Sequence, residues 1–187
     1  MIDTITKAVK VLREGGVILY PTDTIWGLGC DPSNQSAVEK IFALKRRNDS
    51  KSLVLLALNM KMVERYIPQI PEVAYQLVET AVKPLTVVYS DPTDLAPNLL
   101  AQDGSVGIRV PEHDFCKSLL ASFKKPIVST SANISGEASP SSFEQISKEI
   151  IQGVDFIVPP HLAGTQTGSA STIIKLESSG VVKIIRH

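Results

Sequence analysis

Several patterns that would assign a function directly are missing from this sequence. Its two cysteines, Cys30 and Cys116, lie far apart and form no Cys-x-x-Cys pair, so they predict neither a zinc site nor a redox motif. We therefore expect two reduced thiols in a cytoplasmic protein. The three histidines, His113, His161 and His187, are scattered, and no paired carboxylates stand out. Metal binding by protein side chains is thus not predicted, and acid–base catalysis is poorly supported.

The common glycine-rich phosphate motifs are also missing. No G-x-x-x-x-G-K-[ST] loop occurs, and Gly27-Leu28-Gly29 is not followed by the third glycine of a dinucleotide-binding fingerprint. By itself this Gly-x-Gly indicates a turn. Any nucleotide site must therefore be constructed in another way.

Long hydrophobic runs and an excess of one charge are absent as well. The longest aliphatic run, Leu53–Leu58, is far shorter than the roughly 18 residues that a membrane span needs. The N-terminus lacks the basic and apolar regions of a secretory signal. Lys+Arg and Asp+Glu both number 19, which argues against a surface coated for nucleic acid but allows a local basic patch. With 43% hydrophobic residues among 187, the chain suits one domain with a substantial core.

Hydrophobic periodicity predicts helices that alternate with short strands. Pro21–Asp31 and Ser131–Ser139 read as polar connections, and Ser141 with Glu144 fits a capping box for a helix that ends near Gly153. The helices are expected around 5–12, 38–45, 60–67, 71–82, 115–123 and 141–153, and the strands around 17–20, 53–58, 86–89, 106–110, 127–129, 156–158, 171–176 and 181–186. The pattern predicts an α/β fold, with a sheet that is mixed because the last two strands are close enough to pair antiparallel.

Small hydroxyl residues gather beside the predicted strand ends, where α/β proteins usually bind ligands. They occur in Thr22-Asp23-Thr24, in Ser129-Thr130-Ser131 and in Ser169-Ala170-Ser171-Thr172. Four basic residues accompany them: Lys45, Arg47 and Lys51 follow the second helix, and Arg109 lies within a strand. An arginine on an apolar strand needs an anionic partner.

Each feature also has a structural explanation. Lys45 and Arg47 could complement the dipole at a helix C-terminus, and the threonine-rich turns could be ordinary caps. Arg109 could form an internal ion pair, Asp23 could be a turn former, and Trp26 could fill the core. The joint occurrence of these features is harder to explain in this way than any one of them.

Taken in order, these stretches resemble the YrdC-like family, the bacterial threonylcarbamoyl-AMP synthases. The matching pieces are Tyr20–Asp31 (YPTDTIWGLGCD), Lys45-Arg46-Arg47, Ile108–Pro111, Ser129–Gly136 (STSANISG), Ser171–Ile174 and Arg186. The first and fourth pieces are long and specific. The resemblance covers nearly the whole chain and suits the short bacterial form, a single catalytic domain over residues 1–187.

The resemblance implies a fold and a reaction. The fold is a twisted, open, mixed α/β sheet flanked by helices, with a basic concave face. The reaction joins L-threonine, bicarbonate and ATP into threonylcarbamoyl-AMP and pyrophosphate, with magnesium accompanying the triphosphate. The product then serves tRNA threonylcarbamoyl-transfer proteins in the cytoplasm, and contact with tRNA or other RNA is possible.

The resemblance also assigns residues. Lys45 and Arg47 would be catalytic and would bind ATP together with Lys51, Ser131, Asn133 and Arg186. Thr24, Arg109 and Ser171 would hold threonine, with Arg109 on its carboxylate.

The sequence departs from the family pattern in four places. Asn48 replaces a proline after Lys-x-Arg, Trp26 a tyrosine, and Leu56 a histidine found in some members; Lys83-Pro84-Leu85-Thr86 replaces Gly-Pro-x-Thr. None of these changes removes a phosphate-binding cation.

Two rival functions remain. An RNA-binding module without ATP turnover is disfavoured by the zero net charge and by the lack of aromatic and basic interleaving. A carbamoyl-transfer domain of the kind found in hydrogenase-maturation proteins is expected only inside longer chains.

Overall fold

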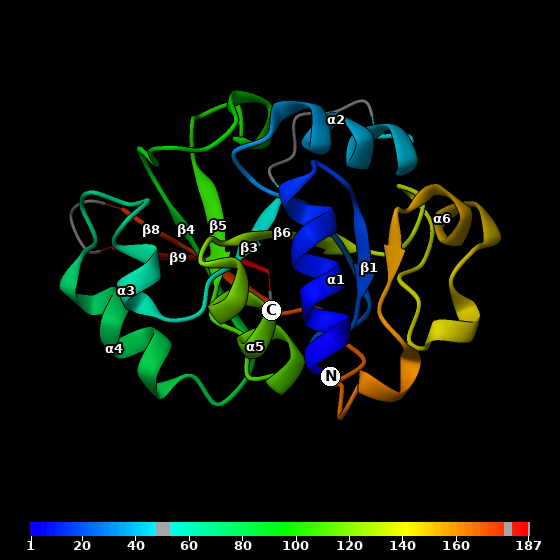
Figure 1. Cartoon of the computed structure of the whole chain (residues 1–187). Helices are drawn as coiled ribbons and strands as arrows, with labels where there is room; N and C mark the ends of the chain where they lie inside the picture. Colours follow the sequence, from blue (N-terminus) through cyan, green and yellow to red (C-terminus); the bar gives the residue numbers. More distant parts are fainter. Residues whose placement is uncertain (48–52, 178–180, 187) are drawn as a thin grey trace.

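Nine strands form one mixed sheet in the computed structural model, which describes residues 1–47, 53–177 and 181–186 (Figure 1). The strands are β1 (Ile18–Tyr20), β2 (Gly27–Gly29), β3 (Val54–Leu56), β4 (Leu85–Tyr89), β5 (Val106–Arg109), β6 (Ile127–Ser131), β7 (Phe156–Ile157), β8 (Thr172–Leu176) and β9 (Val182–Arg186). They lie side by side in the order β7-β1-β2-β6-β3-β5-β4-β8-β9. The pairs β1–β7, β3–β5 and β4–β8 are parallel and the others antiparallel, so the predicted mixed α/β sheet is confirmed.

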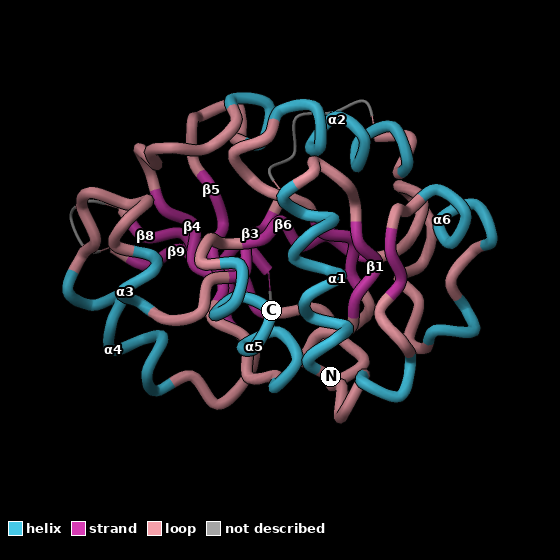
Figure 2. The backbone as a smooth tube through the Cα atoms, viewed as in Figure 1, coloured by secondary structure: helices cyan, strands magenta, loops and turns pink. Residues whose placement is uncertain are grey.

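Six α-helices flank this sheet within the described residues (Figure 2). They are α1 (Ile2–Arg13), α2 (Gln35–Leu44), α3 (Met60–Val63), α4 (Glu72–Thr80), α5 (Asp114–Phe123) and α6 (Lys148–Gly153). Four begin at a side chain that accepts a backbone N–H, namely Asn34, Asn59, His113 and Ser147. None of the helices in the described ranges is long and apolar enough to cross a membrane.

The two faces of the sheet carry separate hydrophobic cores because successive strand residues point to opposite sides. Ile18 packs with α1 and α5, whereas Leu19 packs in the cluster that contains α2 and α6. Ile127 and Val128 divide in the same way. Figure 1 shows α1 and α5 lying together in front of the strands. In β6, Ser129 and Ser131 alternate with Val128 and Thr130, so these two serines share the face of Ile127.

The helix predicted from Ser141 to Gly153 is wrong in its first half. The backbone N–H and the hydroxyl of Ser141 both donate to the Gln145 side chain, and a single 3-10 turn covers Phe143–Gln145. Ile146 and Ser147 are then extended, so the helix starts only at Lys148, with Ser147 as its N-cap. The hydroxyl predicted to cap a helix instead closes a local turn, an alternative that serine offers the backbone.

The turn predicted for Gly27-Leu28-Gly29 is also wrong, because these residues form strand β2 between β1 and β6. A Cβ atom on Gly29 would lie 2.8 Å from the Val128 carbonyl oxygen and 2.7 Å from Cε1 of Tyr20. Glycine is therefore needed for close packing rather than for a bend. All residues from Pro21 to Asp31, expected as a polar turn, are buried.

Candidate functional site

The connection between β1 and β2, residues 21–26, is held in shape by hydroxyl groups. Thr22 Oγ1 donates to the Ile25 carbonyl over 2.8 Å and accepts the Thr24 N–H over 3.1 Å. The Thr24 hydroxyl lies 2.8 Å from Thr22 Oγ1, and it is the donor because the only hydroxyl proton of Thr22 points to Ile25. The oxygen of Thr24 thus remains free to accept a further donor.

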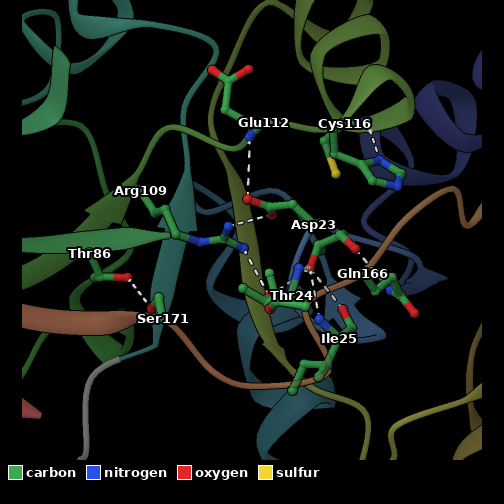
Figure 3. A network of polar contacts seen from close by, with 12 residues as sticks. Asp23, Thr24, Ile25, Thr86, Arg109, Glu112, Cys116, Gln166 and Ser171 are labelled. Carbon is green, nitrogen blue, oxygen red and sulfur yellow. Dashed lines mark hydrogen bonds and ion pairs between the residues drawn. The ribbon is translucent and has the colours of Figure 1, made fainter. Parts of the chain in front are cut away.

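That donor comes from Arg109 at the end of β5, as Figure 3 shows. Its guanidinium donates to Thr24 Oγ1 over 3.3 Å and forms an ion pair with the Asp23 carboxylate. The second oxygen of Asp23 accepts the Glu112 N–H over 3.3 Å. Both charged side chains are buried, with 4% of Arg109 and 10% of Asp23 exposed. The anionic partner that a buried arginine requires is therefore supplied by the protein itself.

A cavity of about 290 Å³ lies beside this ion pair. It contains most of the predicted site residues: Thr24, Arg47, Arg109, Ser131, Ser171 and Arg186. Its other lining residues are Thr22, Ile25, Trp26, Gly27, Leu53, Val54, Ser129, Thr130, Ser139, Ala170 and Ile173. The lining thus combines three arginines with many hydroxyls and includes no carboxylate among the described residues.

Lys45, the residue that follows α2, does not line the cavity but contacts the lining residue Ser131 and holds the loop after β6. Its ammonium donates to the carbonyl oxygens of Ser131, over 2.5 Å, and Asn133, over 2.7 Å, while its own carbonyl accepts the Ser135 N–H. The residue is 3% exposed. Burial, together with the nearby charge of Arg47, lowers the pKa of Lys45 to about 8.

Ser171 and Arg186 come from the C-terminal strands. The Ser171 hydroxyl lies 2.7 Å from Thr86 Oγ1 of β4, and its carbonyl accepts Nε and Nη2 of Arg186 over 3.2 and 2.8 Å. Arg186 and Lys45 are thus each held by neutral carbonyl groups, which orient a positive charge without cancelling it.

Of the predicted ATP-binding residues that the structure describes, Lys45 and Asn133 do not line the cavity. Lys51 lies outside the described residues, as does Asn48. Asn133 points into its own loop, where its Nδ2 donates to the carbonyls of Ile134 and Glu137. Its buried Oδ1 has no hydrogen-bond partner within the part of the chain that the structure describes.

Sequence reasoning missed two contributors to the site. Ser139 lines the cavity from the loop after β6, three residues beyond the end of the Ser129–Gly136 motif. Asp23 was interpreted as a turn former, although it is the carboxylate that pairs with Arg109. The sequence held a signal for this pairing, because a buried arginine demands an acid and Asp23 stands in the same motif as the predicted site residue Thr24.

The structure offers little for metal or thiol chemistry. No group of His, Cys, Asp and Glu with the spacing of a metal site exists among residues 1–47, 53–177 and 181–186. Cys30 and Cys116 are both free and buried, and burial raises the pKa of each thiol. Neither cysteine is therefore a good nucleophile.

A family model and a named relative both match most of this chain. The model of the Sua5/YciO/YrdC family, described as "Telomere recombination", matches residues 10–187. A protein of Hahella chejuensis named threonylcarbamoyl-AMP synthase is 37% identical over 161 residues, which cover 86% of this chain and 88% of that protein.

Solved structures agree with this similarity. E. coli YciO superposes with a TM-score of 0.86 at 26% identity, and the match covers 100% of this chain and 90% of YciO. P. abyssi Sua5, solved in complex with L-threonine, gives a TM-score of 0.84 at 29% identity over 92% of this chain. The chain spans about half of that protein, since the match covers 50% of Sua5.

Proposed function

Because the chain belongs to the Sua5/YciO/YrdC family, as its motifs predict, we propose that it is a threonylcarbamoyl-AMP synthase. It uses ATP to activate L-threonine and bicarbonate, and it releases threonylcarbamoyl-AMP and pyrophosphate. The product serves tRNA modification in the cytoplasm, where it is passed to threonylcarbamoyl-transfer proteins. An RNA surface on this chain is not needed for that activity.

The observation that carries the proposal is the cavity whose described lining combines three arginines with many hydroxyl groups and contains no carboxylate. Arginines bind phosphates and carboxylates through paired N–H donors, and hydroxyls add hydrogen bonds without charge. Such a lining suits a polyanion and a small polar molecule at the same time. ATP and threonine have these properties.

The nucleotide would lie between the loop after β6 and the C-terminal strand. Arg47 and Arg186 bind phosphate oxygens, and Lys45 adds its charge while it fixes the loop that carries Ser131. Asn133 would support the nucleotide through the shape of this loop, because its Nδ2 donates to the carbonyls of Ile134 and Glu137. Lys51 is proposed to reach the phosphates as well.

Threonine would lie at the opposite side, across the turn of residues 21–26. Thr24 and Ser171 offer hydroxyls, and Arg109 attracts the carboxylate while it keeps its ion pair with Asp23. In the reaction, the amino group of threonine takes up bicarbonate carbon with loss of water to form a carbamate. A carbamate oxygen then attacks the α-phosphorus of ATP, and the bond to the pyrophosphate oxygen breaks.

The protein contributes positioning and charge rather than a covalent intermediate. Arg47 and Lys45 neutralise the charge that gathers on the α-phosphate and on the departing pyrophosphate, as cations do in other phosphoryl-transfer sites. Arg47 would touch the phosphates and act as a catalytic residue, whereas Lys45 would assist through its charge and through the loop that it holds. Magnesium fits as a companion of the triphosphate, because the described lining offers hydroxyls but no carboxylate to hold it alone.

A pyrophosphate-release assay tests the function when each substrate is omitted in turn. We expect release to need ATP, L-threonine and bicarbonate together. Release from ATP that is indifferent to threonine would contradict the proposal. Salt-sensitive RNA binding in the absence of turnover would instead support an RNA-binding module.

A further inference from the structure

A short segment, residues 164–168, lies across the turn that carries Thr24. We call it the strap. It begins at Gly164 and ends at Gly168, and both glycines have positive φ values, 57° and 71°. Other residues adopt this backbone conformation rarely, so the two glycines allow the chain to reverse at each end of the strap.

The strap binds the turn through three carbonyl groups in succession. Gln166 Nε2 donates to the Thr22 carbonyl over 2.9 Å, Thr167 N–H to the Asp23 carbonyl over 2.8 Å, and Gly168 N–H to the Thr24 carbonyl over 3.0 Å. Figure 3 shows Gln166 reaching towards this turn, opposite Arg109. The only side chain among these three donors is that of Gln166.

Both ends of the strap are fixed to the body of the protein. Before it, the Ala163 carbonyl lies 2.7 Å from Nε2 of His113, the N-cap of α5. Since Nδ1 of His113 accepts the Cys116 N–H, Nε2 carries the proton and donates to Ala163. After the strap, Ser171 is held by Thr86 and by Arg186.

The strap therefore connects the two halves of the threonine site of the proposed function. Thr24 lies on the turn that the strap holds, and Ser171 follows three residues after Gly168. We infer that the strap sets the separation of these two hydroxyls, and that Gln166 is a positioning residue for the amino-acid substrate. It acts through the Thr22 carbonyl and touches none of the three substrates.

This inference rests on the proposed function, and it requires that threonine binding and attachment of the strap stabilise each other. If threonine binds across Thr24 and Ser171, it must favour the state in which the strap is attached to the turn. Opening of the strap then becomes rarer when threonine is present. ATP, bound at the other side of the cavity, should depend little on the strap.

Gln166→Met tests the inference, because methionine keeps the length of the side chain and removes the donor. Loss of one hydrogen bond of ordinary strength should raise the KM for threonine about fivefold. We expect kcat and the affinity for ATP to stay near their wild-type values. Gln152→Met, an exposed glutamine on α6, is the matched control and should change neither constant.

Hydrogen exchange gives a second readout, which does not depend on turnover. Threonine should slow exchange of the Thr167 and Gly168 amides in the wild type, and Gln166→Met should weaken this protection. An unchanged KM with unchanged protection in Gln166→Met would overturn the inference. Equal losses of ATP and threonine affinity would also overturn it, since they would indicate a general structural role.

The two proposals fail in different ways. If wild-type pyrophosphate release does not depend on threonine, the proposed function is wrong, and the proposed role of the strap in threonine binding is wrong as well. If the wild type needs threonine but Gln166→Met behaves like Gln152→Met, the function stands and only the role of the strap is wrong.

Discussion

At the scale of single residues, Lys45 has an unusual position for a residue predicted to bind phosphate. Its ammonium is buried and bonded to two carbonyl groups, and it does not line the cavity. In the proposed function it would act on the phosphates through its charge, without lining the cavity itself. A neutral amine can still donate to both carbonyls, so deprotonation removes the charge without releasing the loop.

This arrangement predicts a pH dependence of ATP binding. The pKa of Lys45, lowered to about 8 by burial and by Arg47, means that the ammonium loses its proton as pH rises through 8. ATP affinity should therefore fall between about pH 7 and 9. The fold should not weaken over this range, because a pKa below the unfolded value makes stability rise as the buried charge is lost.

Calorimetric titration with ATP from pH 7 to 9 measures whether ATP affinity falls as pH rises. Urea unfolding over the same range measures whether stability is kept. In Lys45→Arg the guanidinium stays charged, so the pH dependence of affinity should disappear. If that variant does not fold, NMR titration of 13C-labelled lysine in the wild type reports the Lys45 pKa directly. An ATP affinity that is flat from pH 7 to 9 in the wild type would refute the charge contribution.

Arg109 shows how far residue-level reasoning reaches. Its place on an apolar strand correctly predicted that it has an anionic partner, but the sequence did not show which group that partner is. Asp23 is distant in sequence, and only the fold brings the two together. Reasoning from the sequence chose the substrate carboxylate, whereas the structure first provides a protein carboxylate.

At the scale of elements, β2 is a strand because glycine lets its two neighbours approach. Gly29→Ala should lower the free energy of unfolding by roughly 2 kcal/mol, since its Cβ would meet the Val128 carbonyl and the Tyr20 ring. Urea denaturation measures this change. Gly104→Asn is the control: Gly104 has a φ of 75° and open space around it, and asparagine tolerates that backbone. Equal stability of the two variants would show that β2 can shift to make room.

Helices with a clear apolar face were predictable, and elements that depend on distant contacts were not. Ile5, Ala8, Val9 and Leu12 mark α1 by their spacing, and all four are buried. Ser141 fits a cap equally well on paper, yet it binds Gln145 and the helix starts later. The local sequence pattern does not show which of two possible partners the Ser141 hydroxyl will bind. It also does not show that β2 will pair with β1 on one edge and with β6 on the other.

At the scale of the whole molecule, the candidate site joins the first turn to the last strand. Its residues were predicted largely from motifs at widely separated positions, and the cavity brings most of them together. The parts that sequence could not supply are the supporting contacts, such as the clasp by Lys45 and the strap on residues 22–24.

Such a site should couple ligand binding to global stability. ATP at about 100 times its Kd should add about 2.7 kcal/mol to the free energy of unfolding. Arg186→Ala should lose much of this gain while it changes the unliganded stability little, because β9 is exposed along its length. Urea titrations followed by fluorescence of the single tryptophan, Trp26, measure both quantities.

The control lies on the same strand. Lys183→Ala removes a cation that pairs with Glu177 and does not line the cavity, so ATP should stabilise it like the wild type. If Arg186→Ala keeps the full gain, Arg186 belongs to the strand pair alone.

The strand order also has a consequence for how a cell makes this protein. The central strand β3 pairs with β5 and β6, which are synthesised much later than β3. In the same way, β1 can pair with β7 only after most of the chain has been made. Ser171 and Arg186 are made later than all of these strands. During synthesis the growing chain must therefore keep apolar strands such as β3 unpaired for several seconds. The proposed nucleotide site can form only after β9 has been made, so a chain that stops before β8 lacks this site and exposes the unpaired edge of β4 to aggregation.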